Sequence, residues 1–294
     1  MFIRQLAYLT ALARERHFAR AAVRCSVSQP TLSAGIRSLE NELGVAVVMR
    51  GHRFVGLTPE GLRVLEWAQR SLADLESLKQ ELLALKHGLV GRLRIGAVPT
   101  ALPVLAPLTA RLLAQHPQLS LDVSSATSGQ IQQGLEGFEL DLGITYLDNE
   151  PLRAFRSLPL YSETYIFLAP ADEWPDRNSV TWSEAASANL CLLNPHMQNR
   201  RIVDAALSAA GSGVNARIEA DSFVTLAAFL QTGAWASIFP ASYLPFVPAG
   251  LAVKSMQIRD QERAQTIGIV YPDREPVPPS TRAVLAEAKA TLTP

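Results

Sequence analysis

The side chains best suited to reading another molecule lie on one face of a helix predicted at residues 28–43. Apolar residues recur there at spacings of three and four, which predicts an amphipathic helix: Leu32, Ile36, Leu39 and Leu43. The opposite face carries Gln29, Thr31, Ser33, Ala34 and Arg37. Amide, hydroxyl and guanidinium groups hydrogen bond to base edges and phosphates. The pattern indicates a DNA-reading helix, with ordinary core packing as the alternative.

The neighbouring segments supply the elements that would position this helix. A first helix is predicted at residues 2–14 and a short second one at 18–24, followed by a three-residue turn. Ser28 is placed to cap the third helix, Pro30 fits its first turn, and Gly44 is typical of its end. Two helices joined by such a turn form a helix-turn-helix unit. The strand-like runs 45–49 and 54–57 predict a β-hairpin wing around Gly51-His52-Arg53.

Charge is distributed unevenly along the 294 residues, although the formal total is zero. Residues 1–58 contain eight arginines and three acidic residues, a formal charge of +5. Residues 59–90 carry −1 and residues 91–294 carry −4. A basic N-terminal segment followed by an acidic remainder is typical of a DNA-binding module fused to another domain. Chance asymmetry is the alternative on charge alone.

Thr58-Pro59 predicts the start of a long helix that runs to about His87. Leucine and alanine recur along it at spacings of three and four. Such a seam favours pairing with a second copy of the chain. A long helix that packs on its own domain is the alternative.

From residue 91 onward, apolar strands alternate with helices, which predicts an α/β domain with mostly parallel sheets. About 200 residues suffice for two small lobes with a cleft between them. The predicted strands are 92–98, 119–125, 140–146, 165–169, 190–193, 216–220 and 234–239. The predicted helices are 102–116, 129–137, 198–210, 223–232 and 280–291.

The composition and motifs exclude several classes of protein. With 48% hydrophobic and 18% charged residues, the chain is globular and not disordered. No apolar run is long enough to span a membrane, and the N-terminus lacks the features of a signal peptide, so we expect a cytoplasmic protein. No nucleophile elbow, P-loop, GxGxxG or HExxH motif is present, so no enzyme, cofactor or metal site is expected. Cys25 and Cys191 are far apart, and Cys191 is expected to be buried packing and not a sensor.

The sequence resembles the LysR-type transcriptional regulators. The resemblance spans the whole chain and is most specific over the first 65 residues. The motifs that carry it are F-x-R-A-A at Phe18–Ala22, S-x-S-Q-P-x-L-S at Ser26–Ser33, I-x-x-L-E at Ile36–Glu40, ELG at Glu42–Gly44, LTxxG at Leu57–Gly61 and GRLRIGAVPT at Gly91–Thr100.

The resemblance implies an all-α winged helix-turn-helix domain at 1–58, a linker and dimerisation helix at 59–90, and an effector-binding domain at 91–294. The effector domain would resemble type 2 periplasmic binding proteins. Its first lobe would comprise about 91–162 and 268–294, and its second lobe about 163–267. Members of this family are usually homotetramers that bend promoter DNA and respond to a small metabolite in the interlobe cleft.

Site residues follow from the resemblance together with the helix geometry. The DNA-reading set is Gln29, Pro30, Thr31, Ser33 and Arg37, with Arg50 and Arg53 in the wing. The effector set is Thr100, Ala101, Ser128, Thr145, Tyr146, Asn194, His196, Val224 and Thr225. Plain helix capping is the alternative for several of these. Ala34 and Gly35 depart from the family, which often has a long basic or amide side chain there, and the sequence offers no reason for Gly35.

Taken together, the sequence predicts a ligand-responsive regulator that binds promoter DNA and is modulated by a small anion, because helix N-termini facing the cleft favour negative charge. A solute-binding protein with the periplasmic-binding fold is one alternative. An α/β enzyme is the other.

Overall fold

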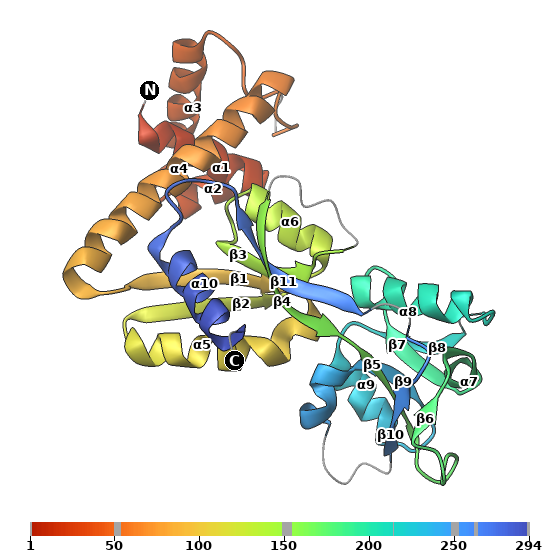
Figure 1. Ribbon diagram of the computed structural model, residues 1–294. Helices are drawn as coiled ribbons and strands as arrows, with labels where there is room; N and C mark the ends of the chain where they lie inside the picture. The colour runs from red at the N-terminus through yellow and green to blue at the C-terminus, as the bar shows by residue number, and fades with distance from the viewer. Residues whose placement is uncertain are drawn as a thin grey trace. The chain divides into compact units, whose positions relative to one another are not determined.

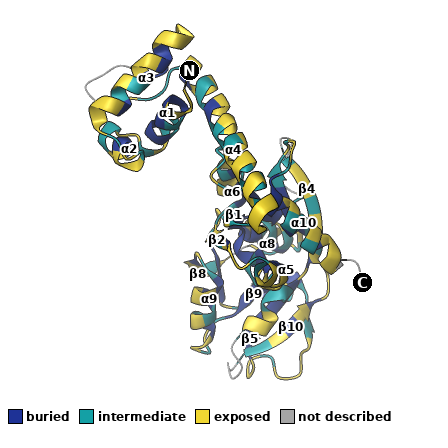
Figure 2. Ribbon diagram, turned by 90° about the vertical axis from the view of Figure 1, so that its left-hand side faces the viewer, coloured by how far each residue is buried: buried dark blue, intermediate teal, exposed yellow. Residues whose placement is uncertain are grey.

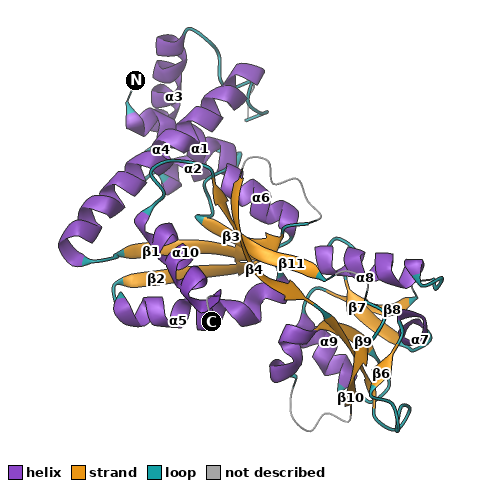
Figure 3. Ribbon diagram, in the orientation of Figure 1, coloured by secondary structure: helices purple, strands orange, loops and turns teal. Residues whose placement is uncertain are grey.

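The computed structural model describes residues 2–49, 54–148, 155–213, 215–247, 253–261 and 264–292. The chain divides into two compact units, Met1–Leu89 and Val90–Pro294. The first unit is helical and the second combines strands with helices, as the colours of Figure 3 show. Among the described residues, no helix is both long and apolar enough to cross a membrane.

The described part of the first unit contains four helices, α1 (Ile3–Glu15), α2 (Phe18–Arg24), α3 (Gln29–Leu43) and α4 (Pro59–His87). Its core is apolar, and the side chains of Leu9, Leu12, Leu32 and Leu39 are fully buried. Ala68 of α4 belongs to the same core. Burial of these leucines follows the predicted spacing of three and four, so the helix-turn-helix prediction is confirmed (Figure 1).

The ends of α3 follow from local sequence. Ser28 Oγ accepts a hydrogen bond from the Thr31 backbone N–H at 3.3 Å, and Pro30 occupies the first turn. At the other end, Gly44 has φ of 69°, the left-handed conformation that glycine adopts without strain. These caps fix where the polar face of the helix begins.

The described part of the predicted wing is an antiparallel bridge between Val48 and Leu57, with the Met49 N–H donating to the Gly56 carbonyl at 3.0 Å. Its base is attached to α3 through Glu40, which is buried. The Glu40 Oε1 atom accepts from the N–H groups of Val47 (2.9 Å) and Val48 (3.1 Å). The predicted tip, Gly51-His52-Arg53, lies outside the described residues.

The described part of the second unit contains a five-stranded and a four-stranded sheet, joined by two chain crossings, and a two-stranded pair. The first sheet has the order β2-β1-β3-β11-β4. Its strands are β1 (Gly91–Ala97), β2 (Leu119–Ser125), β3 (Leu142–Tyr146), β4 (Phe155–Glu163) and β11 (Gln265–Pro272). Around it lie η1 (Pro99–Ala101), α5 (Leu102–Gln115), α6 (Ser128–Glu136) and α10 (Pro279–Leu292).

The second sheet has the order β6-β10-β5-β9, with a separate pair β7-β8. Its strands are β5 (Tyr165–Pro170), β6 (Ser179–Val180), β9 (Ser237–Pro240) and β10 (Val253–Ile258), and the pair is β7 (Leu190–Leu193) with β8 (Ala216–Ala220). The helices here are α7 (Trp182–Ala186), α8 (Gln198–Ala209), α9 (Phe223–Leu230) and η2 (Ala241–Phe246).

The expectation of mostly parallel sheets is wrong for much of this unit. The pairs β1-β2, β1-β3, β7-β8 and β6-β10 are parallel, whereas β11-β3, β11-β4, β5-β9 and β5-β10 are antiparallel. The reason is the double crossing: β4 leads the chain out of the first sheet and β11 brings it back alongside, so the two run in opposite directions. The strands β4, β6, β10 and β11 were also not expected from the sequence, although β11 contains an apolar run at residues 267–271.

Candidate DNA-binding surface and effector site

Of the apolar residues of α3, Leu32, Ile36 and Leu39 are buried, whereas Leu43 at its end is exposed; Figure 2 colours this helix by burial. Gln29, Pro30, Thr31 and Arg37 are exposed and Ser33 is half-buried. Every described member of the predicted DNA-reading set therefore lies on the surface of one helix. Arg50 and Arg53, the predicted wing contacts, lie outside the described residues.

The long helix α4 exposes apolar side chains along its length. Those with large exposed areas are Leu62, Trp67, Leu78, Leu82, Leu83 and Leu85. Apolar groups of this size on a helix that its own unit does not cover are typical of a contact surface for another chain.

A buried hydrogen-bond cluster connects the two sheets of the second unit. Its central residue is Glu163, the last residue of β4, whose Oε1 atom accepts from the hydroxyls of Tyr146 (2.7 Å) and Tyr165 (3.0 Å). The Tyr146 hydroxyl also shares a hydrogen bond with Thr100 (3.2 Å) and accepts from Asn199 Nδ2 (3.5 Å). We call these five residues the interlobe cluster.

Members of the interlobe cluster come from both sides of the double crossing. Thr100 and Tyr146 follow β1 and end β3 of the first sheet, whereas Tyr165 opens β5 and Asn199 lies in the first turn of α8. Tyr243 of η2 adds a second connection, because its hydroxyl donates to the Pro99 carbonyl. The cluster therefore joins groups from both lobes.

Burial dominates the electrostatics of this cluster. Glu163 is only 2% exposed, and desolvation raises the pKa of its carboxyl group to about 7, although hydrogen bonds from Tyr146 and Tyr165 oppose the shift. Burial likewise raises the pKa of Tyr146 and of Tyr165 well above the usual range, and the Glu163 charge raises both further. Both tyrosines therefore stay protonated and act as donors to Glu163.

The structure brings some of the predicted effector residues together. Thr100 and Tyr146 belong to the interlobe cluster, and Ala101 follows Thr100 in η1 and is buried. Ser128 and Thr145 are buried, and the Thr145 hydroxyl donates to Ser128 Oγ at 3.0 Å. These five residues come from η1, which follows β1, from the end of β3 and from the start of α6.

The remaining predicted effector residues lie at helix starts of the second lobe. Asn194 donates its backbone N–H to the Ala220 carbonyl at 2.8 Å, and His196 is exposed. Thr225 takes part in the cap of α9, where its N–H donates to Ser222 Oγ at 3.2 Å. Val224 is 81% exposed at the same turn.

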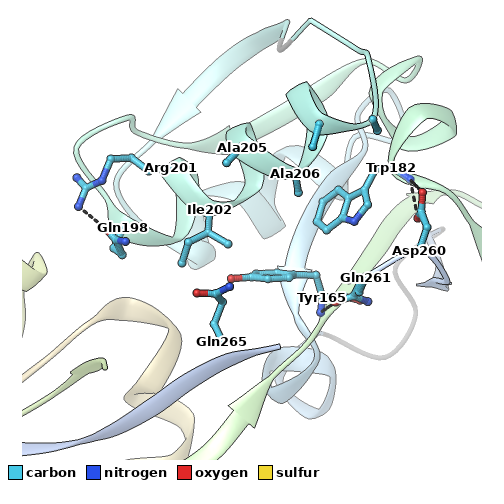
Figure 4. Close-up of a pocket in the computed structure, with 12 residues that line it drawn as sticks. Tyr165, Trp182, Gln198, Arg201, Ile202, Ala205, Ala206, Asp260, Gln261 and Gln265 are labelled. Atoms are coloured by element: carbon cyan, nitrogen blue, oxygen red, sulfur yellow. Dashed lines mark hydrogen bonds between the residues drawn. The ribbon is translucent and has the colours of Figure 1, made fainter. Parts of the chain in front are cut away.

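A pocket of about 730 Å³ lies beside the crossing strands. Its walls are α8, represented by Ile202 and Ala206, and the rings of Tyr165 and Trp182, with Gln265 at the start of β11 (Figure 4). Tyr165 therefore contributes its ring to the pocket and its hydroxyl to Glu163. Sequence reasoning missed both Glu163 and this pocket.

A helix-turn-helix unit with an exposed polar recognition helix, followed by a two-lobed unit with a buried polar cluster between its lobes, defines a DNA-binding regulator with an effector domain. Comparison with known families agrees. Residues 3–62 match the bacterial regulatory helix-turn-helix proteins of the lysR family, and residues 86–293 match the LysR substrate binding domain. The chain belongs to the LysR family of transcriptional regulators, and the predicted family, fold class and function are confirmed.

Several relatives align over nearly the full chain. The DNA-binding transcriptional dual regulator OxyR of Escherichia coli K12 is 33% identical over 279 residues, covering 94% of this chain and 91% of the relative. The hydrogen peroxide-inducible genes activator of Haemophilus influenzae is 30% identical over 280 residues, covering 94% and 92%. These relatives are regulators of transcription, so neither alternative, solute-binding protein or enzyme, is favoured.

Solved structures give the same result. A variant of full-length OxyR from Pseudomonas aeruginosa has a TM-score of 0.77 and 29% identity, covering 99% of this chain and 94% of that one. CbnR in complex with its target DNA has a TM-score of 0.67 at 21% identity, covering 99% and 100%. At 21% identity, the similarity to CbnR shows a shared fold only.

Proposed function

We propose that this regulator reads promoter DNA with α3 and changes its DNA binding when a small anion occupies the region between the lobes. The observation that supports the DNA part is the exposed polar face of α3, with Gln29, Thr31 and Arg37 beside a buried leucine face. Pro30 and Ser33 complete the contact set on this helix, and Arg50 and Arg53 are proposed as wing contacts. Amide and hydroxyl groups can contact bases, whereas Arg37 is placed to reach phosphate or guanine.

The effector part is supported by the interlobe polar residues. These residues form two hydroxyl pairs, Thr100 with Tyr146 and Thr145 with Ser128 at the start of α6, and hydroxyls and helix N–H groups suit a small anion. Ala101 and Asn194 are proposed as neighbours of this site. His196, Val224 and Thr225 are proposed as outer contacts from the second lobe.

We further propose the domain limits 1–58, 59–90 and 91–294 and a cytoplasmic location. The lobes would comprise 91–162 with 268–294, and 163–267. Self-association through α4 into dimers, and then into a homotetramer, is supported by its exposed leucines. Light scattering of the full-length chain and of Leu82→Asp tests this, because the variant should lose mass if α4 forms the interface.

A gel shift of the full-length protein on DNA from its own promoter region tests the DNA-binding proposal. Arg37→Ala should weaken binding and reduce the slope of log affinity against log salt by about one if Arg37 neutralises one phosphate. The matched control is Arg111→Ala, which removes an arginine that is also exposed from α5 of the effector unit. Equal loss of binding in both variants, or no binding by the wild type at low salt, would contradict the proposal.

A further inference from the structure

The carboxyl group of Glu163 has hydrogen-bond partners at only one of its two oxygens. Oε1 accepts from both tyrosine hydroxyls, whereas Oε2 is buried and has no hydrogen-bond partner among the described residues. A buried carboxylate oxygen without a donor carries the full cost of lost hydration. A proton on Oε2 removes the charge and leaves both tyrosine hydrogen bonds in place. The arrangement therefore singles out Oε2 as the atom that takes up a proton.

The groups around Glu163 are hydroxyls and amides. They come from the elements that meet it: Thr100 of η1, Tyr146 of β3, Tyr161 of β4, Tyr165 of β5, Asn199 of α8, Tyr243 of η2 and Gln265 of β11, which is the register partner of Glu163. Among the described residues, no arginine, lysine or histidine contributes to the shift of the Glu163 pKa. The burial of this acid is thus not offset by a cation, and its two protonation states lie close in free energy near neutral pH.

An anion bound in this region would lie close to the Glu163 carboxyl group, which carries a charge of the same sign when it is ionised. Thr100, the proposed effector contact, is separated from the Glu163 carboxyl by only two hydrogen bonds, through the Tyr146 hydroxyl. An ionised Glu163 would repel the bound anion in a water-poor environment, whereas a neutral carboxylic acid would not.

We propose that the interlobe site takes up one proton together with its anionic effector, and that Oε2 of Glu163 carries this proton. The inference rests on the anionic effector stated under Proposed function and deepens it. The proton comes from solvent and forms an O–H bond at Oε2, and no other bond changes. In the bound state the Glu163 carboxyl group is then neutral and the anion carries the remaining charge, so the affinity for anions rises as pH falls toward neutrality from above.

Binding of sodium acetate and of sodium sulfate to the full-length protein, measured by calorimetry from pH 6 to pH 8.5, tests this proposal. Both anions stay ionised over that range, so any linked proton belongs to the protein. In the wild type the affinity should be nearly constant below the Glu163 pKa and fall about tenfold per pH unit above it. Glu163→Gln, which is neutral at every pH, should bind with an affinity that does not depend on pH.

Tyr165→Phe supplies a second, conservative variant that keeps the ring and removes one donor to Oε1. It should raise the pH above which affinity falls, because the ionised carboxylate loses a hydrogen bond. Binding that is independent of pH in the wild type, or equally dependent in Glu163→Gln, would overturn the proton uptake and leave the anionic effector intact. Failure of both anions to bind either protein at any pH would instead overturn the anionic effector itself, and the proton uptake with it.

Discussion

Gly35 of α3 lies directly against the ring of Tyr8 of α1. A Cβ atom built on Gly35 would be 2.6 Å from Tyr8 Cδ2 and 2.8 Å from Cε2, closer than any side chain tolerates. Tyr8 itself is buried in the core of the helix-turn-helix unit. The glycine therefore lets the recognition helix approach α1, which explains a residue that is unfavourable in a helix interior.

Gly35→Ala is expected to destabilise the first unit by about 1–3 kcal/mol, because overpacking outweighs the better helix propensity of alanine. Thermal unfolding followed by circular dichroism measures the change. In a Tyr8→Leu background the same substitution should cost less, since the ring that it strikes is gone. An equal cost in both backgrounds would show that the contact with Tyr8 is not the cause.

The parts of the fold that could be predicted are those set by residues close together in the sequence. The ends of α3 depend on Ser28, Pro30 and Gly44, which act within one turn of the chain, and its buried face follows a simple periodicity. Gly35 could not be explained in this way, because its partner Tyr8 is 27 positions earlier and is brought near only by tertiary packing.

In the candidate site, too, residues next to predicted elements could be identified, whereas those placed by tertiary packing could not. Thr100 and Tyr146 could be selected because they stand next to predicted strands, at the end where parallel sheets bind ligands. Glu163 gave no such signal, since β4 was not predicted and its hydrogen-bond partners come from two other elements, β3 and β5. A half-exposed strand such as β4, with Pro159 inside it, lacks the alternation or the apolar run that sequence reasoning needs.

Glu40 is expected to hold the base of the wing against α3. Its Oε1 atom accepts from two backbone N–H groups, those of Val47 and Val48, and the residue is buried. Glu40→Gln replaces a charged acceptor by a weaker one and adds a buried amide that needs partners, so a loss of about 1–3 kcal/mol in unfolding free energy is expected. Glu76→Gln on the exposed face of α4 is the control and should change stability by less than about 0.5 kcal/mol. Similar values for the two variants would argue against this role of Glu40.

Cys191 is expected to be inert toward peroxide, although several relatives are named hydrogen peroxide-inducible activators. The sequence has two cysteines, and Cys191 is the only one in the effector unit, so no disulfide can form within that unit. Burial raises the pKa of the Cys191 thiol to about 11, and the nucleophilic thiolate is therefore scarce at neutral pH.

Mass spectrometry after peroxide treatment and alkylation of the native protein should find Cys191 as unmodified thiol. Gel shifts with wild type and Cys191→Ala should be the same with and without peroxide. Rapid sulfenic acid formation at Cys191 in the folded protein, accompanied by altered DNA binding that the alanine variant lacks, would show instead that the thiol is a sensor.

Glu163 should make the stability of the effector unit depend on pH even without a ligand. Its carboxyl group has a pKa of about 7 when folded, against an ordinary value of 4.5. Between these values the folded state binds a proton that the unfolded state has lost, so stability falls as pH rises through this window. The difference of about 2.5 pKa units corresponds to an upper limit of roughly 3 kcal/mol, reached above pH 7.

The measurement is denaturant unfolding of the full-length protein in a Trp67→Phe background, so that fluorescence reports only Trp174, Trp182 and Trp235 of the effector unit. The quantity to compare is the unfolding free energy of Glu163→Gln minus that of its parent, from pH 5 to pH 8. This difference should grow in favour of the glutamine variant as pH rises, because glutamine never carries the buried charge. Other carboxyl groups titrate alike in both proteins and cancel. A difference that stays constant with pH would mean that Glu163 titrates near its ordinary value, so that its burial between the lobes is relieved by water or by a partner group.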